Sequence, residues 1–246
     1  MKRYGRGPIR WLWRLILALA LAAAAVAALY LTRGYRMYRQ AVEQKSIEQA
    51  AAELRAAPDF TPLDQLSQTY LDAVIAVEDH RFYEHGGVDV IAVCRAVWVD
   101  VTSLSFAEGG STITQQLAKN LFFTQQKTFE RKFAEVFAAF ALERQLSKDE
   151  ILELYVNSIY FGSGYYSIGA AAKGYFGKTP ALLTAGECTV LAGLPNAPSA
   201  YAPGEDPTLA LQRQRQVLRK MVKYGKLTQQ QADAIAAEPV FGPPQS

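Results

Sequence analysis

The longest apolar stretch of the chain covers residues 15–31 and contains no charged residue. With residues 11–14 added and Arg14 extending toward the headgroups, it reaches roughly 30 Å at about 1.5 Å per residue, enough to cross a bilayer. The pattern predicts a transmembrane helix over 11–31 after a basic cytoplasmic tail, 1–10. A cleaved signal peptide is the alternative, but the stretch is long for a signal core and Tyr30 begins a poor cleavage site.

The remaining chain divides by composition into three parts. A polar, Ala/Gln/Glu-rich stretch predicts a stalk over 32–60, a folded domain follows over 61–235, and a Pro-rich tail covers 236–246. Thr61 and Pro62, with an acid two residues later, form a predicted helix start at the beginning of the domain.

Helical periodicity dominates the predicted domain. Apolar residues recur at helical spacing in three segments, Leu71/Val74/Ile75, Phe133/Val136/Phe137/Phe140 and Ile151/Leu152/Tyr155. Ser147 and Glu150 form a capping box that opens a helix from Lys148 to Val156, and another helix is expected from Leu209 to Met221. Strand alternation is scarce, so the predicted fold class is mainly α.

The charge of the domain argues against a nucleic-acid partner. Five basic residues precede residue 15, so the rest of the chain carries 21 basic and 23 acidic residues although the whole chain is formally +3. The two cysteines, Cys94 and Cys188, lie in apolar helical contexts and are interpreted as buried free thiols, with a disulfide as the alternative.

Glu78 falls on the helix face that should be buried, seven residues after Leu71. Desolvation raises the pKa of a carboxylate, and a raised pKa suits a general base near neutral pH. The alternative is that the helix ends at Val77 and that Glu78 and Asp79 are solvated in a turn.

A glycine-rich segment leads into a polar helix face. Gly109 and Gly110 are followed by polar residues at helical spacing, which are Thr112, Gln115, Gln116 and Lys119. Free N–H groups at a helix start and a donor-rich face suit an anion such as a pyrophosphate. An ordinary amphipathic helix is the alternative.

Glu135 shares a helix face with Arg131, Lys132 and two small residues, Ala138 and Ala139. The small side chains leave room for a ligand on this interpretation. A solvated Arg131–Glu135 ion pair on the surface is the alternative.

Other catalytic patterns are absent from the sequence. His80 and His85 have no cysteine near them and the wrong spacing for one helix face, so no metal site is expected. There is no S-x-x-K or K-T-G motif of the penicillin-binding transpeptidases.

Together these segments resemble the family 51 glycosyltransferases, the lysozyme-like peptidoglycan polymerases. Five motifs occur in family order: EDHRFYEHGGVD from Glu78, GGSTITQQLAKNLF from Gly109, RKFAEVFAAFALERQLSKDEILELYVNSIYFG from Arg131, GAAAKGYFGK from Gly169 and AGECTVLAGLPNAPSAYAP from Ala185. The resemblance implies a lysozyme-like helical domain with a small membrane-proximal lobe. The last motif departs mildly, with Gly186 and Cys188 beside Glu187.

The resemblance also implies roles for individual residues. Glu78 is expected to be the catalytic base and Glu135 the second acid of the cleft, while Lys119 and Arg131 face the pyrophosphate of the donor. The polar residues expected around the donor are Ser111, Thr112, Gln116 and Asn120, and those expected to shape the site around the base are Asp79, Phe82 and His85.

The implied substrates are lipid II as acceptor and a growing glycan strand as donor, joined by an inverting displacement. No tightly bound cofactor is expected, although Mg²⁺ or Mn²⁺ at the substrate pyrophosphate fits the family. The implied location is the cell membrane, single-pass, with the catalytic domain outside the cytoplasm, and other cell-wall synthesis proteins remain open as partners. Because the chain stops at Ser246, it is expected to lack cross-linking activity.

Three alternatives remain open at this point. The apolar segment from Ile91 to Phe106 either dips into the lipid interface or forms a buried core helix. A lysozyme-like hydrolase that cuts glycan would also pair an acid with a helical fold. An inactive membrane-anchored scaffold that binds lipid II or wall enzymes is the third.

Overall fold

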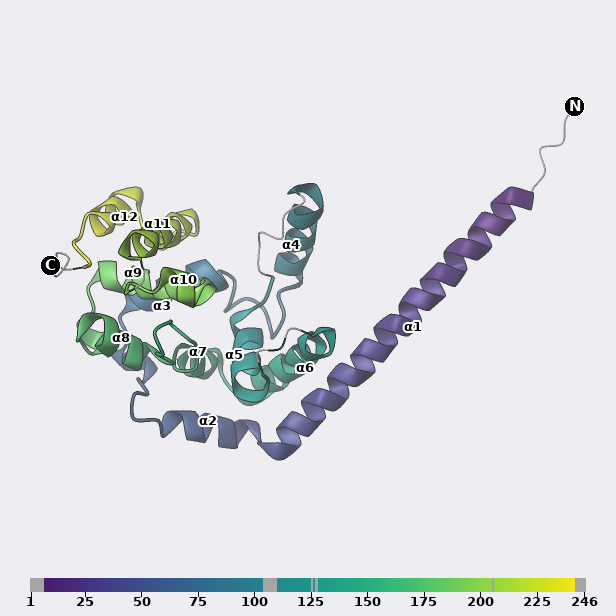
Figure 1. Ribbon diagram of the computed structural model, residues 1–246, viewed down its shortest axis with the longest axis horizontal. Helices are drawn as coiled ribbons and strands as arrows, with labels where there is room; N and C mark the ends of the chain where they lie inside the picture. The colour runs from purple at the N-terminus through teal and green to yellow at the C-terminus, as the bar shows by residue number, and fades with distance from the viewer. Residues whose placement is uncertain (1–6, 104–109, 125, 127, 205, 242–246) are drawn as a thin grey trace, which may run out of the picture.

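The computed structural model describes residues 7–103, 110–124, 126, 128–204 and 206–241 (Figure 1). Its helices are α1 (Gly7–Gln44), α2 (Ile47–Arg55), η1 (Leu63–Gln65), α3 (Gln68–Glu78), α4 (Val90–Ser103), α5 (Ile113–Phe122), α6 (Phe129–Gln145), α7 (Lys148–Val156), α8 (Ile168–Phe176), η2 (Pro180–Leu182), α9 (Ala185–Gly193), η3 (Leu194–Asn196), α10 (Pro198–Tyr201), α11 (Pro207–Lys223) and α12 (Gln229–Ala236). Within these described ranges the only β pairing is an isolated bridge between Tyr160 and Tyr166. The predicted class, mainly α with one apolar N-terminal helix, is confirmed.

The core forms around α3 and α9. These two helices pack against each other and both pack against α11, while α5 packs against α6 and α7. Every residue of α9 from Gly186 to Gly193 is buried, and Tyr70 of α3 and Tyr155 of α7 are among the largest fully buried side chains. The end of α3 therefore emerges from the well-packed centre of the fold, and the candidate site lies at this end of the helix.

Side-chain caps set several helix starts, as the sequence predicted in part. The Ser147 hydroxyl accepts from the Glu150 N–H and the Glu150 carboxylate accepts from the Ser147 N–H, so the predicted capping box and the helix Lys148–Val156 are confirmed. The helix start at Thr61 was wrong. Only the short turn η1 follows it, without a side-chain cap, and the backbone N–H and carbonyl of Thr61 are both bound by the Asn157 side chain.

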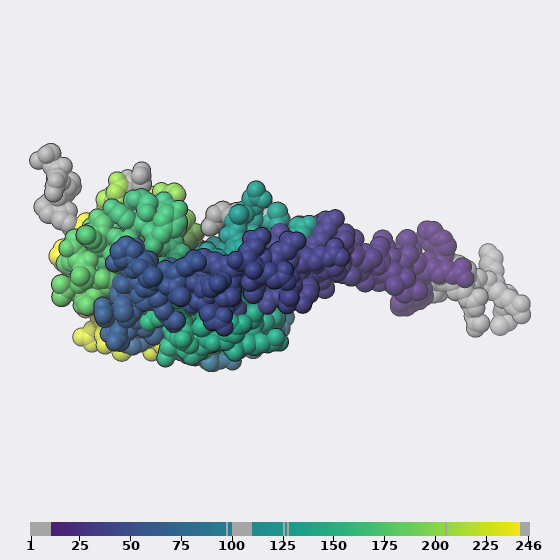
Figure 2. All heavy atoms as spheres, turned by 90° about the horizontal axis from the view of Figure 1, so that it is seen from below, coloured from purple at the N-terminus to yellow at the C-terminus, as the bar shows by residue number. Residues whose placement is uncertain are grey.

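The helix α1 continues beyond its predicted end at residue 31 to Gln44. Its apolar part is long enough to cross a membrane, and it projects as an arm from the helical body (Figure 2). The second half packs against α6: a Cβ on Gly34 would lie 2.5 Å from the Phe133 Cβ, and the Tyr35 and Phe137 rings meet edge to face at 5.3 Å. The expected stalk over 32–60 is therefore packed against the body rather than separate from it.

The α1–α6 contact also explains the aromatic face of α6. Phe133 and Phe137, which belong to the predicted apolar periodicity, face α1, while the opposite face, with Ala134, Ala138 and Leu142, is buried against the body. Small side chains let α5 and α6 approach closely, so Ala138 fills the helix contact and does not leave the predicted room for a ligand.

The helix α4 rises from the body of the protein (Figure 1), and its large apolar side chains are exposed where they are described. Val90, Ile91 and Trp98 are 67%, 55% and 71% exposed, so the buried-helix interpretation of this segment was wrong for its described part; Phe106 lies outside the described residues. Cys94 is exposed, contrary to prediction, because it belongs to this helix. Cys188 is a buried free thiol, as predicted.

Candidate active site

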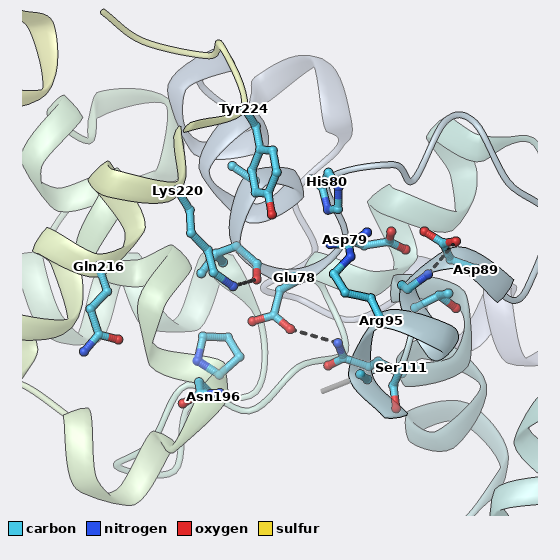
Figure 3. A pocket seen from close by; sticks show the side chains of 18 of the residues that line it. Glu78, Asp79, His80, Asp89, Arg95, Ser111, Asn196, Gln216, Lys220 and Tyr224 are labelled. Atoms are coloured by element: carbon cyan, nitrogen blue, oxygen red, sulfur yellow. Dashed lines mark hydrogen bonds between the residues drawn. The ribbon is translucent and has the colours of Figure 1, made fainter. Parts of the chain in front are cut away.

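A cavity of about 580 Å³ opens where α3 ends (Figure 3). Its wall combines the end of α3 with parts of α4, α5, the turn after α9 and α11. The polar and charged residues that line it are Glu78, Asp79, His80, Asp89, Arg95, Ser111, Thr112, Gln116, Asn196, Arg213, Gln216, Lys220, Lys223 and Tyr224.

Glu78 is the last residue of α3 and its half-buried side chain lies in this wall. The Gln116 Nε2 donates a 2.8 Å hydrogen bond to its carboxylate, and the Tyr155 hydroxyl donates to the Gln116 Oε1 at 3.3 Å. The helix includes Glu78, whereas the alternative interpretation assumed that it ends at Val77. The Glu78 carboxylate is thus held in the cavity by Gln116, whose own side chain is oriented by a hydrogen bond from Tyr155.

Asp79 turns the chain away from α3 and fastens it to α5. Its carboxylate accepts from the His85 Nε2 at 2.9 and 3.0 Å and from the Ile113 N–H at 3.1 Å, where the positive end of the α5 dipole favours an anion. Phe82 is completely buried, with the Lys148 ammonium 4.4 Å from its ring centroid. Phe82 and His85 lie behind the cavity wall, where they support the turn that presents Glu78.

The polar face of α5 divides between structural and exposed groups. The Thr112 hydroxyl donates to the Gly87 carbonyl at 2.6 Å and accepts from the Gln115 N–H, so this buried side chain is committed to the helix cap. Ser111 lines the cavity and accepts from the Lys132 ammonium at 2.6 Å. Asn120 does not line it, and its amide lies 3.5 Å from the Ser158 hydroxyl. The structure thus brings Ser111 and Gln116 to Glu78.

Glu135 forms the centre of a buried ionic cluster on α6. Its carboxylate lies 2.6 Å from the Arg131 Nη1 and 3.1 Å from the Lys132 Nζ, and its side chain is only 3% exposed. The solvated ion-pair interpretation was therefore wrong, although the predicted pair exists. Burial lowers the pKa of Lys119 and the nearby Glu135 carboxylate opposes this shift, which places a third cation beside the cluster.

Asp79, His85 and Asp89 bring potential ligand atoms within 4.8 Å of one another. The Asp79 carboxylate is already engaged by His85 and Ile113, and the Arg81 Nε lies 3.6 Å from the Asp89 carboxylate. The Asp79 oxygens are therefore already hydrogen-bonded within the protein, and the expectation of no metal site stays a prediction.

Sequence reasoning missed the part of the site that comes from α11. Arg213, Gln216, Lys220 and Lys223 all line the cavity, and their spacing of three, four and three residues places them on one helix face. The opposite face carries Val217, Leu218 and Met221, which are buried. This amphipathic pattern was the available signal. The stacking of His80 on Tyr224, with ring centroids 4.0 Å apart, had no signal in the sequence.

Comparison with known proteins agrees with the motifs. The model of the transglycosylase family matches residues 43–222, and the chain belongs to this family. A Cupriavidus necator protein named "Putative transglycosylase H16_A0665" is 44% identical over 193 residues, which cover 78% of this chain and 82% of that protein. The resemblance to peptidoglycan glycosyltransferases is confirmed.

Penicillin-binding proteins are further relatives. Penicillin-binding protein 1A of Escherichia coli is 48% identical over 178 residues, which cover 72% of this chain and 21% of that protein. The crystal structure of penicillin-binding protein 1A from Haemophilus influenzae aligns with 74% of this chain and 18% of that one, at 24% identity and a TM-score of 0.45. The chain thus spans about a fifth of the length of these relatives.

Proposed function

We propose that this membrane-anchored transglycosylase polymerises lipid II into β-1,4 glycan with release of undecaprenyl pyrophosphate, and that Glu78 is the general base. The family supports a peptidoglycan glycosyltransferase reaction. The single observation that carries the residue assignment is the position of Glu78, a carboxylate oriented by Gln116 in the wall of the cavity.

In the proposed reaction Glu78 accepts the proton of the acceptor's 4-hydroxyl as that oxygen attacks the anomeric carbon of the donor. The new C–O bond forms as the bond from that carbon to the pyrophosphate breaks, so the configuration inverts without a sugar–enzyme intermediate. A positioned base contributes about 10²–10⁴-fold to the rate of such a step.

The leaving pyrophosphate needs cations that are already in place. Lys119, Arg131 and Lys132 are grouped around Glu135, whose carboxylate fixes the two cations of α6. Donors fixed before the reaction stabilise developing charge more effectively than solvent does. Mg²⁺ or Mn²⁺ would bind through the substrate's own pyrophosphate, because Glu135 is already paired with Arg131 and Lys132.

Two exposed apolar elements of the protein, the first part of α1 and the helix α4, suit a reaction between membrane-bound substrates. We place the apolar part of α1 across the cell membrane, with the catalytic domain outside the cytoplasm. The exposed apolar residues of α4 suit the lipid interface on the same side, and the lipid chains of both substrates would leave the cavity there.

The test is polymerisation by the full chain in detergent, with labelled lipid II and products resolved by size. Glu78→Gln removes the base, and Glu84→Gln is the matched control because this exposed carboxylate belongs to the same segment but lies outside the cavity. We expect a ladder of glycan from the parent and from Glu84→Gln, and none from Glu78→Gln. Shortening of pre-formed glycan with lipid II untouched would identify a hydrolase, and no reaction with either substrate would favour the scaffold.

A further inference from the structure

The helices α1 and α6, which lie beside each other in Figure 1, run in the same direction along their contact. Four contacts join them in an order that rises along both helices: Tyr30 with Phe129, Arg33 with Glu130, Gly34 with Phe133, and Tyr38 with Phe137. In an antiparallel pair this order would be reversed. A residue of α6 therefore lies at the same level along the α1 axis as the residue of α1 that it contacts.

The first of these contacts lies where the apolar part of α1 ends. Residues 15–31 contain no charge, and Arg33 is the first charged residue that follows them. Tyr30 is thus at the boundary of the predicted membrane-spanning part, a level at which tyrosine rings are common. The Phe129 and Tyr30 rings meet edge to face with their centroids 5.7 Å apart, so Phe129 lies at the level of this boundary.

Phe129 is the first residue of α6, and its side chain is 72% exposed. The Thr128 hydroxyl caps the helix immediately before it by accepting from the Arg131 N–H at 3.1 Å. A single exposed phenylalanine is common on protein surfaces and by itself indicates nothing. Phe129 differs because the helix that it contacts has an apolar part long enough to cross a membrane.

Charges follow on both helices directly beyond this level. The Arg33 guanidinium lies 3.3 Å from the Glu130 carboxylate, and both side chains are partly exposed. Apolar and aromatic residues are therefore followed by an ion pair at the same place on α1 and on α6. This order, going away from the apolar part of α1, matches the change from acyl chains to headgroups across the surface of a bilayer.

We infer that the start of α6 is a further membrane contact, in which Phe129 enters the lipid surface beside Tyr30. Its partner is the boundary between acyl chains and headgroups, which binds phenylalanine side chains of interfacial helices. The contact adds a point of support to those that α1 and α4 provide, and it lies on the helix that carries the ionic cluster.

The contact also sets the level of the cluster. Arg131 and Lys132, the two cations paired with Glu135, follow Phe129 within one turn of α6. They therefore lie at the level of the headgroup phosphates, where the pyrophosphate of a lipid-linked donor would also lie. This consequence rests on the proposed function, whereas the contact of Phe129 with lipid does not.

The test measures the depth of Phe129 in vesicles that contain no lipid II. The variant W11F/W13F/W98F/F129W has a single tryptophan, at the start of α6. We expect its fluorescence to be quenched several times more strongly by acyl chains brominated near the headgroup than by chains brominated near their ends. Aqueous acrylamide should quench it weakly.

Phe140→Trp in the same background is the matched control, because this residue is also exposed on α6 and lies about 16 Å farther along the helix axis. It should be quenched by acrylamide and by neither brominated lipid. The same pattern at both positions would overturn the inference. Protection of F129W from acrylamide without quenching by either lipid would indicate contact with protein, such as a second copy of the chain, and would also overturn it.

A cysteine label gives the same measurement if the tryptophan replacements prevent folding. In C94S/F129C the remaining native thiol, Cys188, is buried, so a polarity-sensitive maleimide fluorophore attaches at the start of α6. Its emission in vesicles should lie at shorter wavelength than that of labelled C94S/F140C, and equal emission would contradict the contact. Neither measurement uses substrate, so failure of the parent protein to polymerise lipid II would reject the proposed function alone.

Discussion

The Gln116 amide and the Glu78 carboxylate form a 2.8 Å hydrogen bond that joins α5 to the last residue of α3. The amide is oriented in turn by the Tyr155 hydroxyl, which is fully buried. The orientation of the proposed base therefore depends on two side chains that come from two other helices.

Replacement of Gln116 by Leu should slow polymerisation about tenfold, because a hydrogen bond to a charged group contributes about 1.5–3 kcal/mol. Tyr155→Phe should slow it less, since Tyr155 acts only through Gln116. Initial rates with labelled lipid II and thermal unfolding curves would measure both effects. A Gln116→Leu protein that is folded and polymerises at the parent rate would show that this contact does not position the base.

Replacement of Glu135 by Ala should lower the free energy of unfolding by about 3 kcal/mol, because it leaves Arg131 largely buried without its partner. Glu130→Ala, on the same helix, is the control. Its pair with Arg33 is more exposed, so a change below about 1 kcal/mol is expected. Chemical denaturation measures both, and equal losses in the two variants would contradict the account of the buried cluster.

Trp98 should contact lipid when the protein is in a bilayer. The chain has three tryptophans, so a W11F/W13F variant leaves Trp98 as the single fluorophore. We expect brominated acyl chains to quench it strongly and aqueous acrylamide to quench it weakly, because its side chain is 71% exposed on an apolar helix. The reverse pattern would remove α4 from the membrane interface.

Gly34→Val should separate α1 from α6, since even a Cβ at Gly34 would lie 2.5 Å from the Phe133 Cβ. Overpacking of this kind costs about 1–3 kcal/mol. Ala28→Val, at an exposed position of the same helix, adds similar bulk without this contact. Thermal unfolding in detergent should show a lower Tm for Gly34→Val only, and equal Tm values would contradict a close helix contact.

Burial raises the pKa of the Cys188 thiol to about 11 from an ordinary value of 9.0. The folded state therefore holds this proton more tightly than the unfolded state. The resulting stability is fully present below pH 9 and is lost as the pH rises toward 11, by about 2 kcal/mol. Cys188→Ala should show a shallower decline of the free energy of unfolding over this interval.

The same residue provides a labelling control. At neutral pH a maleimide should modify exposed Cys94 in the native protein and Cys188 only after denaturation. Rapid native modification of Cys188 would contradict its burial in α9.

Local signals predicted the parts of the molecule that local interactions determine. The helix Lys148–Val156 begins at a capping box whose two hydrogen bonds lie within four residues, so the sequence contains the whole cause. Glu78 could be singled out because a carboxylate interrupts an apolar helix face. The family motifs then assigned it a role that periodicity alone could not.

Partners that are distant in the sequence determine the rest. Val77 and Lys220 are 143 residues apart, and no local pattern predicts their hydrogen bond. The Thr112 hydroxyl, which is expected around the donor, donates to the Gly87 carbonyl of another segment, and no local pattern predicts this contact. Residues 32–44 appeared to be a stalk because their partner, the aromatic face of α6, is contributed a hundred residues later.

Because α1 is one continuous helix, it fixes the distance between its apolar part and the residues of α6 against which it packs. Between Leu31 and Gln44 the helix rises about 20 Å at about 1.5 Å per residue, and along this part it packs against α6, which carries Arg131 and Glu135. A helix without a hinge, fixed to the helix that holds the ionic cluster, keeps that cluster at a constant height above the bilayer. For the lipid-linked substrates proposed above, capture would then be a search in two dimensions, governed by lateral diffusion in the lipid.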